Sequence, residues 1–286
     1  MDKVDAKTPE FCLSQLRDLN YDRYLACLYL PEHLRNLAIT LYAFDAEITK
    51  ISAAISEPMI GEIRIQWWRD TISAGVANTH NPLADELIDE LIAHKLPVLP
   101  LDTYLQARIF DLCNDPMPDL GTLEGYCGET ASVFIQLLTM AAKLEQDRTI
   151  ADICGHAGMA LALTDILRLL PQQTAHNKLY IPKEMLDATN LNSEIWFTNE
   201  RDKNHQKATN EILALARHHL AELRNLLRMH SDRIEEIPLI LLPVALCEPY
   251  LKSVQKLGNR IFVTPPTISP FKKHWVLWRS ARTAKI

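Results

Sequence analysis

The sequence predicts an all-α protein that forms one domain over residues 1–286. Three observations lead to this prediction. Apolar residues recur at three- and four-residue spacing through most of the chain, as side chains do on one face of a helix. The chain has 16 prolines and only 8 glycines, and most prolines lie between the apolar periodic stretches, where they would end helices. No alternating stretch is long enough for a convincing strand. With 48% hydrophobic residues, the chain can bury a large core.

Capping residues and prolines set the boundaries of the predicted helices. Thr8, Ser56 and Ser269 are each followed within two residues by a proline, a pattern typical of helix starts. Asn81 is followed by a proline as well, and Pro171 is predicted to end the most apolar helix. The predicted helices cover residues 8–19, 21–30, 31–55, 56 to beyond 71, 82–95, 101–112, 122–144, 148–170, a short stretch after 182, 199–230, 238–257 and 269–283.

The helix predicted over residues 148–170 is apolar on all sides, which favours a place at the centre of a bundle. No uninterrupted apolar stretch of about 18 residues occurs, so we expect no transmembrane helix. The N-terminal residues, MDKVDAKTPEFC, have neither the apolar core of a signal peptide nor the arginine-rich composition of a transit peptide. We therefore expect a cytoplasmic protein.

Charge, cysteine and histidine content argue against two classes of site. The formal net charge of −6 gives no overall basic footprint, so we expect no nucleic-acid partner. The 6 cysteines include no Cys-x-x-Cys pair, and we predict reduced core thiols rather than disulfides or zinc ligands. His156 and His176 are isolated in the sequence, without a second ligand at metal spacing. His218 and His219 are predicted to be solvated on a charged helix surface.

Short segments with distinctive residues recur along the predicted helices: Tyr24 with Pro31 and Arg35, Leu41-Tyr42-Ala43-Phe44, Arg64 with Trp67-Trp68-Arg69, Tyr126-Cys127, Leu163-Thr164-Asp165-Ile166-Leu167-Arg168, Tyr180-Ile181-Pro182 and Pro270. Each is weakly specific alone, but their order and separations resemble the squalene/phytoene synthase family over nearly the whole chain. The resemblance implies an isoprenoid-synthase-like helical bundle around a central cavity.

The same resemblance implies a reaction that the sequence poorly supports. Enzymes of this family join two prenyl diphosphates head to head, with Mg²⁺ held by Asp-rich motifs on two facing helices. Such chemistry needs several carboxylates aimed into one cavity. Here Thr49 and Lys50 stand at acidic positions of the first motif, and Leu169 stands at one of the second. Asp45 and Asp165 remain as weak metal candidates. We therefore expect no cofactor, and Mg²⁺ only if the protein is such an enzyme.

A narrower resemblance covers Phe44-x-x-Glu47-Ile48, the stretch from Ser56 to Trp68, and Arg168 followed by a histidine-containing loop. These segments resemble a divergent branch of the family that assists the assembly of respiratory complex I. The branch implies a non-catalytic role, complex I subunits or assembly intermediates as partners, and a lipid or prenyl chain as a cavity ligand. The lack of a transit-peptide pattern favours a bacterial relative that works in the cytoplasm beside the inner membrane. The alternatives are a Mg²⁺-dependent prenyltransferase of the squalene/phytoene synthase type, and a lipid-binding or scaffold protein unrelated to complex I.

The candidate site residues allow two interpretations. The arginines either bind a phosphate or acidic headgroup inside the cavity, or they form buried ion pairs with the remaining acids. Tyr126 either lines the cavity or is a core tyrosine with a satisfied hydroxyl. The candidates are Arg35, Tyr42, Asp45, Glu47, Arg64, Tyr126, Asp165 and Arg168.

The C-terminal helix combines aromatic and basic residues. Phe271, Trp275, Val276 and Trp278 alternate with Lys272, Lys273, Arg279, Arg282 and Lys285. This composition suits peripheral contact with an anionic membrane surface or an acidic partner. The alternative is that both tryptophans pack on the bundle while the cations remain in water.

Overall fold

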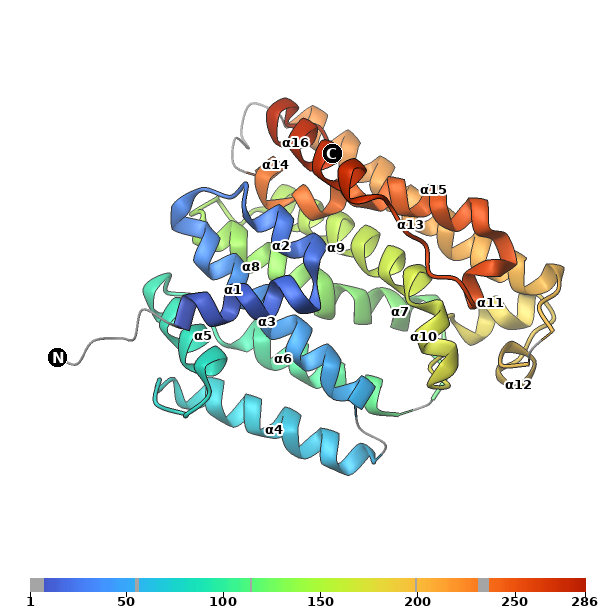
Figure 1. The fold of residues 1–286 in the computed structure, drawn as a ribbon, viewed down its shortest axis with the longest axis horizontal. Coiled ribbons are helices and arrows are strands. Elements are labelled where there is room, and N and C mark those ends of the chain that lie inside the picture. The colour runs from blue at the N-terminus through green and yellow to red at the C-terminus, as the bar shows by residue number, and fades with distance from the viewer. Residues whose placement is uncertain (1–7, 55–56, 114, 199, 231–236) are drawn as a thin grey trace. The chain divides into compact units, whose positions relative to one another are not determined.

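The computed structural model describes residues 8–54, 57–113, 115–198, 200–230 and 237–286, and every regular element within these ranges is helical (Figure 1). The chain divides into two compact units. Unit 1 contains residues 1–113 and 133–150, and unit 2 contains residues 114–132 and 151–286. The all-α prediction is therefore confirmed. Neither unit is one continuous stretch of chain, because residues 114–132 belong with the C-terminal half.

Unit 1 is built around α3 (Glu32–Ala54), which contacts each of the other α-helices that belong wholly to this unit. The predicted apolar face of α3 is the buried one: Leu34, Leu37, Phe44 and Ile48 are each at most 2% exposed. The surrounding elements are α1 (Thr8–Leu19), α2 (Tyr21–Cys27), α4 (Pro58–Ala74), α5 (Pro82–Ala93), α6 (Leu99–Arg108), the 3₁₀ turn Ile109–Leu112 and α8 (Val133–Ala141).

Close packing and a salt bridge position α4 within unit 1. A Cβ atom at Gly61 would overlap the side chain of Leu112, so glycine allows α4 to approach the 3₁₀ turn. Arg69 on α4 donates two hydrogen bonds to Asp102 on α6, at 2.7 and 3.2 Å. The predicted capping residue Ser56 lies outside the described residues. Glu57 is the N-cap, and the following proline occupies the first turn as predicted.

Most of α9 (Arg148–Arg168) belongs to unit 2, where it is the most buried long helix. By length and composition α9 alone among the described helices could cross a membrane, but 67% of its most apolar window is buried inside the protein. The other elements are α7 (Leu120–Cys127), the π-helical turn Gly128–Ser132, α10 (Leu170–Ala175), α11 (Lys183–Ala188), α12 (Ser193–Trp196), α13 (Lys203–Met229), α14 (Ile237–Ile240), the 3₁₀ turn Leu242–Leu246, α15 (Cys247–Leu257), the 3₁₀ turn Gly258–Phe262 and α16 (Pro270–Thr283).

The helix predicted over residues 122–144 is interrupted. Five residues, Gly128–Ser132, form a π-helical turn, and the hydroxyl of Thr130 donates to the carbonyl of Tyr126 at 2.6 Å. This side-chain bond competes with the backbone ladder of the helix. A Cβ atom at Gly158 on α9 would overlap Ser132, so glycine is required where the two segments approach.

Two more predicted boundaries are wrong. The apolar helix ends at Arg168, and Pro171 lies in the first turn of α10 instead of ending α9. Proline fits a first turn because its missing N–H has no intrahelical partner there. The stretch predicted as one helix over 238–257 is divided into α14, a 3₁₀ turn and α15.

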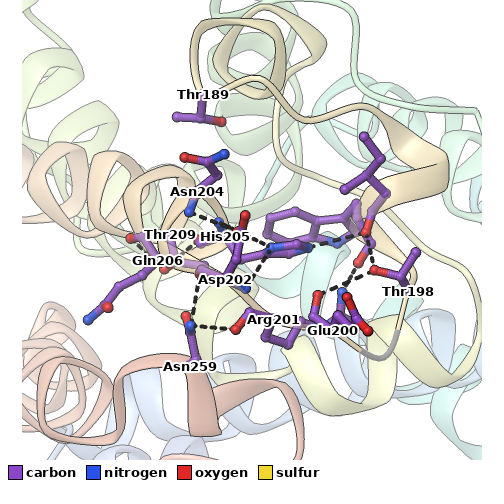
Figure 2. A network of polar contacts seen from close by, with 12 residues as sticks. Thr189, Thr198, Glu200, Arg201, Asp202, Asn204, His205, Gln206, Thr209 and Asn259 are labelled. Atoms are coloured by element: carbon purple, nitrogen blue, oxygen red, sulfur yellow. Dashed lines mark hydrogen bonds and ion pairs between the residues drawn. The ribbon is translucent and has the colours of Figure 1, made fainter.

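The start of α13 is a polar network that the periodicity did not reveal (Figure 2). Asn199, its predicted first residue, lies outside the described residues, and the helix begins at Lys203. Asp202 is the N-cap and forms a capping box with His205, whose imidazole Nδ1 lies 2.8 Å from the Asp202 carboxylate. Asn259 donates to the carbonyls of Arg201 and Asp202. These bonds attach the 3₁₀ turn Gly258–Phe262 to the start of α13.

Candidate functional site

The first motif survives as Asp45 on α3, within unit 1. Its Oδ1 atom accepts two hydrogen bonds, from the hydroxyl of Tyr104 and from Nη2 of Arg108, each 2.8 Å long. Nη1 of Arg108 donates to Oδ2 of Asp111 at 3.0 Å. One guanidinium therefore joins two carboxylates that come from α3 and from the 3₁₀ turn after α6.

This cluster is well shielded from water. The exposed fractions of the side chains are 14% for Arg108, 19% for Asp45 and 3% for Asp111. Burial raises the pKa of Tyr104 well above its ordinary value, and the neighbouring Asp45 carboxylate acts in the same direction. Tyr104 therefore stays protonated at neutral pH and donates to Asp45.

Aromatic side chains pack beside this cluster in unit 1. The ring of Phe44 lies 5.0 Å from that of Trp68 and 5.5 Å from that of Tyr104, centroid to centroid. Tyr104 in turn contacts Phe134 on α8 at 4.9 Å. The contacts of Phe44 with Trp68 and of Tyr104 with Phe134 are edge-to-face, a geometry that stabilises a core. Trp68 is only 3% exposed, so it belongs to the scaffold.

The other candidates on α3 and α4 do not join Asp45. Glu47 accepts a hydrogen bond from Nε2 of Gln15 on α1 at 3.0 Å. Arg35 donates to the carbonyl of Leu30 at 2.9 Å. Arg64 is exposed on α4. The interpretation that Arg35 and Arg64 form buried ion pairs with Asp45 and Glu47 is therefore wrong.

Tyr42 is buried in unit 1 beside a cation. The guanidinium carbon of Arg23 lies 4.8 Å from the centroid of the Tyr42 ring. Burial raises the pKa of Tyr42 to about 12, so its hydroxyl remains protonated. Tyr42 is 3% exposed, as a core tyrosine would be.

The second motif survives as Asp165 on α9, within unit 2. Nη1 of Arg168 donates to its Oδ1 atom at 2.7 Å, one helical turn away. The predicted pairing is therefore present, but the pair is only partly buried, whereas a buried pair was predicted. The exposed fractions are 38% for Asp165 and 29% for Arg168. The Arg168 guanidinium also lies 3.8 Å over the ring of Tyr250 on α15, a cation–π contact.

Tyr126 lies at the end of α7 in unit 2, next to the π-helical turn. Its ring is 5.7 Å from that of Tyr180, which precedes α11. Tyr126 is half-buried, so part of it remains accessible. The contact links two of the segments on which the family resemblance rests.

These residues do not fit the Mg²⁺ of the enzymes. Mg²⁺ takes oxygen ligands in near-octahedral geometry. Here Oδ1 of Asp45 already accepts from Tyr104 and Arg108, and Asp165 is paired with Arg168. In the part of the chain that the structure describes, no group of three or more His, Cys, Asp or Glu side chains could hold a metal ion.

One histidine prediction is wrong. His219 is half-buried rather than solvated, and its Nδ1 atom lies 2.9 Å from Nδ1 of His156 on α9. Burial lowers the pKa of His219 to about 4, and His156 acts in the same direction. His219 is therefore neutral at physiological pH.

Sequence reasoning missed Arg108 and Tyr104, although a weak signal was present. The two residues are four apart on a predicted helix and Asp111 follows three later, so all three share one face. Nothing in this local pattern shows that the face packs against α3. Tyr250, the ring partner of Arg168, carried no such signal.

Comparisons with known proteins agree with this architecture. A family model described as squalene/phytoene synthase matches residues 16–279. A Bos taurus protein named NADH dehydrogenase (ubiquinone) complex I, assembly factor 6 is 28% identical over 257 residues, which cover 89% of this chain and 76% of that protein. A presqualene diphosphate synthase of Sinorhizobium fredii is 27% identical over 220 residues, which cover 76% of this chain and 78% of that enzyme.

The fold is also found among solved structures. A dehydrosqualene synthase crystallised with a ligand superimposes with a TM-score of 0.80 at 16% identity, and the match covers 97% of this chain and 96% of that one. This likeness establishes the isoprenoid-synthase-like fold predicted from the sequence. Since the family model extends through both compact units, the chain belongs to the squalene/phytoene synthase family.

Proposed function

We propose that this protein is a non-catalytic member of its family that assists the assembly of NADH dehydrogenase complex I. The observation that carries the proposal is the state of the two remaining motif acids. Asp45 is bound by Arg108, and Asp165 is bound by Arg168. Similarity to proteins named as complex I assembly factors supports the choice of process.

The energetics of the Asp45 cluster oppose a metal at this position. A metal that bound Asp45 would have to displace Arg108, which also pairs with Asp111 at 3.0 Å. Breaking a buried pair by removing one partner costs about 3–5 kcal/mol, because the other charge remains without compensation. An arginine from the same unit thus supplies the positive charge that Mg²⁺ would bring.

The partners under this proposal are complex I subunits or assembly intermediates. The protein works in the cytoplasm of a bacterium, beside the membrane that holds the complex. A lipid or prenyl chain inside the fold stays a prediction.

A gene deletion in the native host tests the proposal. Assembled complex I, measured by native gel electrophoresis and by NADH:ubiquinone activity, should fall in the deletion strain. Wild-type protein and the variant Asp165→Asn should both restore it, because Asp165 has no catalytic task. Arg168→Gln removes the other half of the same ion pair and is the matched control. The cellular amount of this variant is compared with that of Asp165→Asn.

Two results would contradict the proposal. One is a normal amount of complex I in the deletion strain. The other is Mg²⁺-dependent consumption of farnesyl diphosphate by the purified wild-type protein that is lost in Asp165→Asn. The second result would support the prenyltransferase alternative, because only that function needs the carboxylate as a metal ligand.

A further inference from the structure

Helix α16 in unit 2 carries an exposed aromatic–basic face, defined by Phe271, Trp275 and Trp278 with Lys272, Arg279 and Arg282. The aromatic residues are 80%, 52% and 42% exposed. The alternative in which both tryptophans pack on the bundle is therefore wrong. Large aromatic side chains gathered in water mark an interaction surface.

Helix geometry gathers the aromatic residues on the outer side of α16. Phe271, Trp275 and Trp278 are spaced four and three residues apart, so they form one row along the helix. The rings of Trp275 and Trp278 lie 5.2 Å apart. The inner side is formed by Leu277 and Ser280, which are buried. The row is therefore separate from the face that packs on the 3₁₀ turn Leu242–Leu246.

Positive charge surrounds the aromatic row. Lys272, Arg279 and Arg282 are exposed, and the Arg282 guanidinium lies 5.3 Å from the Trp278 ring centroid. Residues 270–286 contain no Asp or Glu, whereas the whole chain has a net charge of −6. The local charge thus complements an anionic surface, although the protein as a whole would be repelled by one.

The helix is already formed and fixed in unit 2 before any partner binds. Ser269 caps it by accepting a hydrogen bond from the backbone N–H of Lys272, with Pro270 in the first turn. Lys273, on the inner side, lies 5.7 Å from the ring centroid of Tyr250 on α15. Binding through the outer face therefore requires no folding, which lowers the entropic cost of association.

We propose that this face docks the protein on an anionic lipid membrane surface. Phe271, Trp275 and Trp278 enter the boundary between headgroups and acyl chains, where aromatic residues are favoured. Lys272, Arg279 and Arg282 contact lipid phosphates. A lipid surface fits better than an acidic protein because the three rings form one continuous row along the helix. With the helix axis parallel to the membrane, all three rings can enter the lipid boundary together.

Vesicle flotation of the full-length protein tests the proposal. Binding to vesicles of phosphatidylcholine mixed with phosphatidylglycerol should be strong, and binding to phosphatidylcholine alone should be weak. Lys272→Gln/Arg279→Gln should reduce the partition coefficient about fivefold per removed charge. Trp275→Ser/Trp278→Ser should reduce it by at least about tenfold, as loss of two inserted rings requires. Added salt should weaken binding of the wild-type protein.

Matched variants exclude general effects of charge and surface hydrophobicity. Lys203→Gln/Lys207→Gln makes the same charge change on the exposed face of α13. Ile63→Ser removes an apolar residue that is 63% exposed on α4. Both should bind like the wild type. Circular dichroism should show unchanged helix content in every variant, since all of these positions are exposed.

Fluorescence separates insertion from simple adsorption. Tryptophan emission should shift to shorter wavelength on anionic vesicles, and Trp275→Phe/Trp278→Phe should retain binding but lose the shift. The proposal is overturned if the wild type does not distinguish anionic from neutral vesicles, or if the α16 variants bind as well as the two control variants. Failure to bind vesicles, with capture of an acidic protein through the same face, would overturn it in favour of a protein partner.

Discussion

Arg108 is the residue whose removal most directly tests the structure of the Asp45 cluster. In Arg108→Leu the carboxylates of Asp45 and Asp111 lose their shared cation, and Asp111 is only 3% exposed. The lost contacts include two charge-assisted hydrogen bonds, of 2.8 and 3.0 Å, each worth about 1.5–3 kcal/mol. Removing one partner of a buried pair also costs about 3–5 kcal/mol in other proteins. We therefore expect a loss of about 3–5 kcal/mol in the free energy of unfolding.

Urea unfolding followed by circular dichroism measures this loss, provided that the slope of the transition stays the same. The matched control is Arg69→Leu, which breaks the ion pair between Arg69 and Asp102. The side chains of Arg69 and Asp102 are 27% and 40% exposed, so we expect the free energy of unfolding to fall by at most about 1 kcal/mol. The double variant Arg108→Leu/Asp45→Asn should lose less than the sum of its two single variants, because the partners interact directly.

A loss below about 1 kcal/mol in Arg108→Leu, equal to that of the control, would refute the reasoning. It would mean that the Arg108 cation is not needed to balance the two acids. Asp45 would then be available to an external ligand, and the main argument against a metal at this position would fail.

Three further changes have defined outcomes. The pKa of His219 is lowered to about 4, so the unfolded chain binds more protons than the folded one between pH 6.5 and 4. The free energy of unfolding should therefore fall by up to about 3 kcal/mol as the pH falls through this window. His219→Asn should show a flatter dependence in urea unfolding at pH 7 and 5. Burial and repulsion by Glu86 raise the pKa of Glu90 to about 7, so the folded chain binds more protons between pH 4.5 and 7 and stability falls as the pH rises. Glu90→Gln should therefore stabilise the protein at pH 8, by at most about 3 kcal/mol in the same assay, and a destabilised variant would contradict this. Gly158→Ala should lower the free energy of unfolding by about 1–3 kcal/mol because its methyl group overlaps Ser132, whereas Gly155→Ala, with open space at its Cβ position, should be neutral or stabilising.

The sequence predicted those parts of the fold that depend on one helix at a time. The apolar period of α3 identified its buried face, and the capping residues Asn81 and Ser269 mark the starts of α5 and α16. Each of these signals is local, because a helix face or a cap is determined by residues within a few positions of each other.

The parts that failed depend on two distant segments meeting. Arg108 lies 63 positions from Asp45, and the periodicity of α6 does not reveal which helix it contacts. His219 lies among charged residues in the sequence, yet it meets His156, also 63 positions away. The π-helical turn likewise accompanies the close approach of α9 at Gly158. A hydrophobic pattern shows that a face is buried, but it does not identify the polar group that the face will meet.

The Asp165–Arg168 ion pair belongs to a chain of contacts that reaches α16 within unit 2. Arg168 neutralises Asp165 and at the same time lies 3.8 Å over the ring of Tyr250. The same ring is 5.7 Å from the ammonium group of Lys273 on the inner side of α16. Arg168 of α9 and Lys273 of α16 therefore contact the same ring. The charge of Asp165 is balanced by an arginine of its own helix. Contacts that run from Asp165 through Arg168 and Tyr250 to Lys273 therefore link the second motif to the helix that carries the aromatic–basic face.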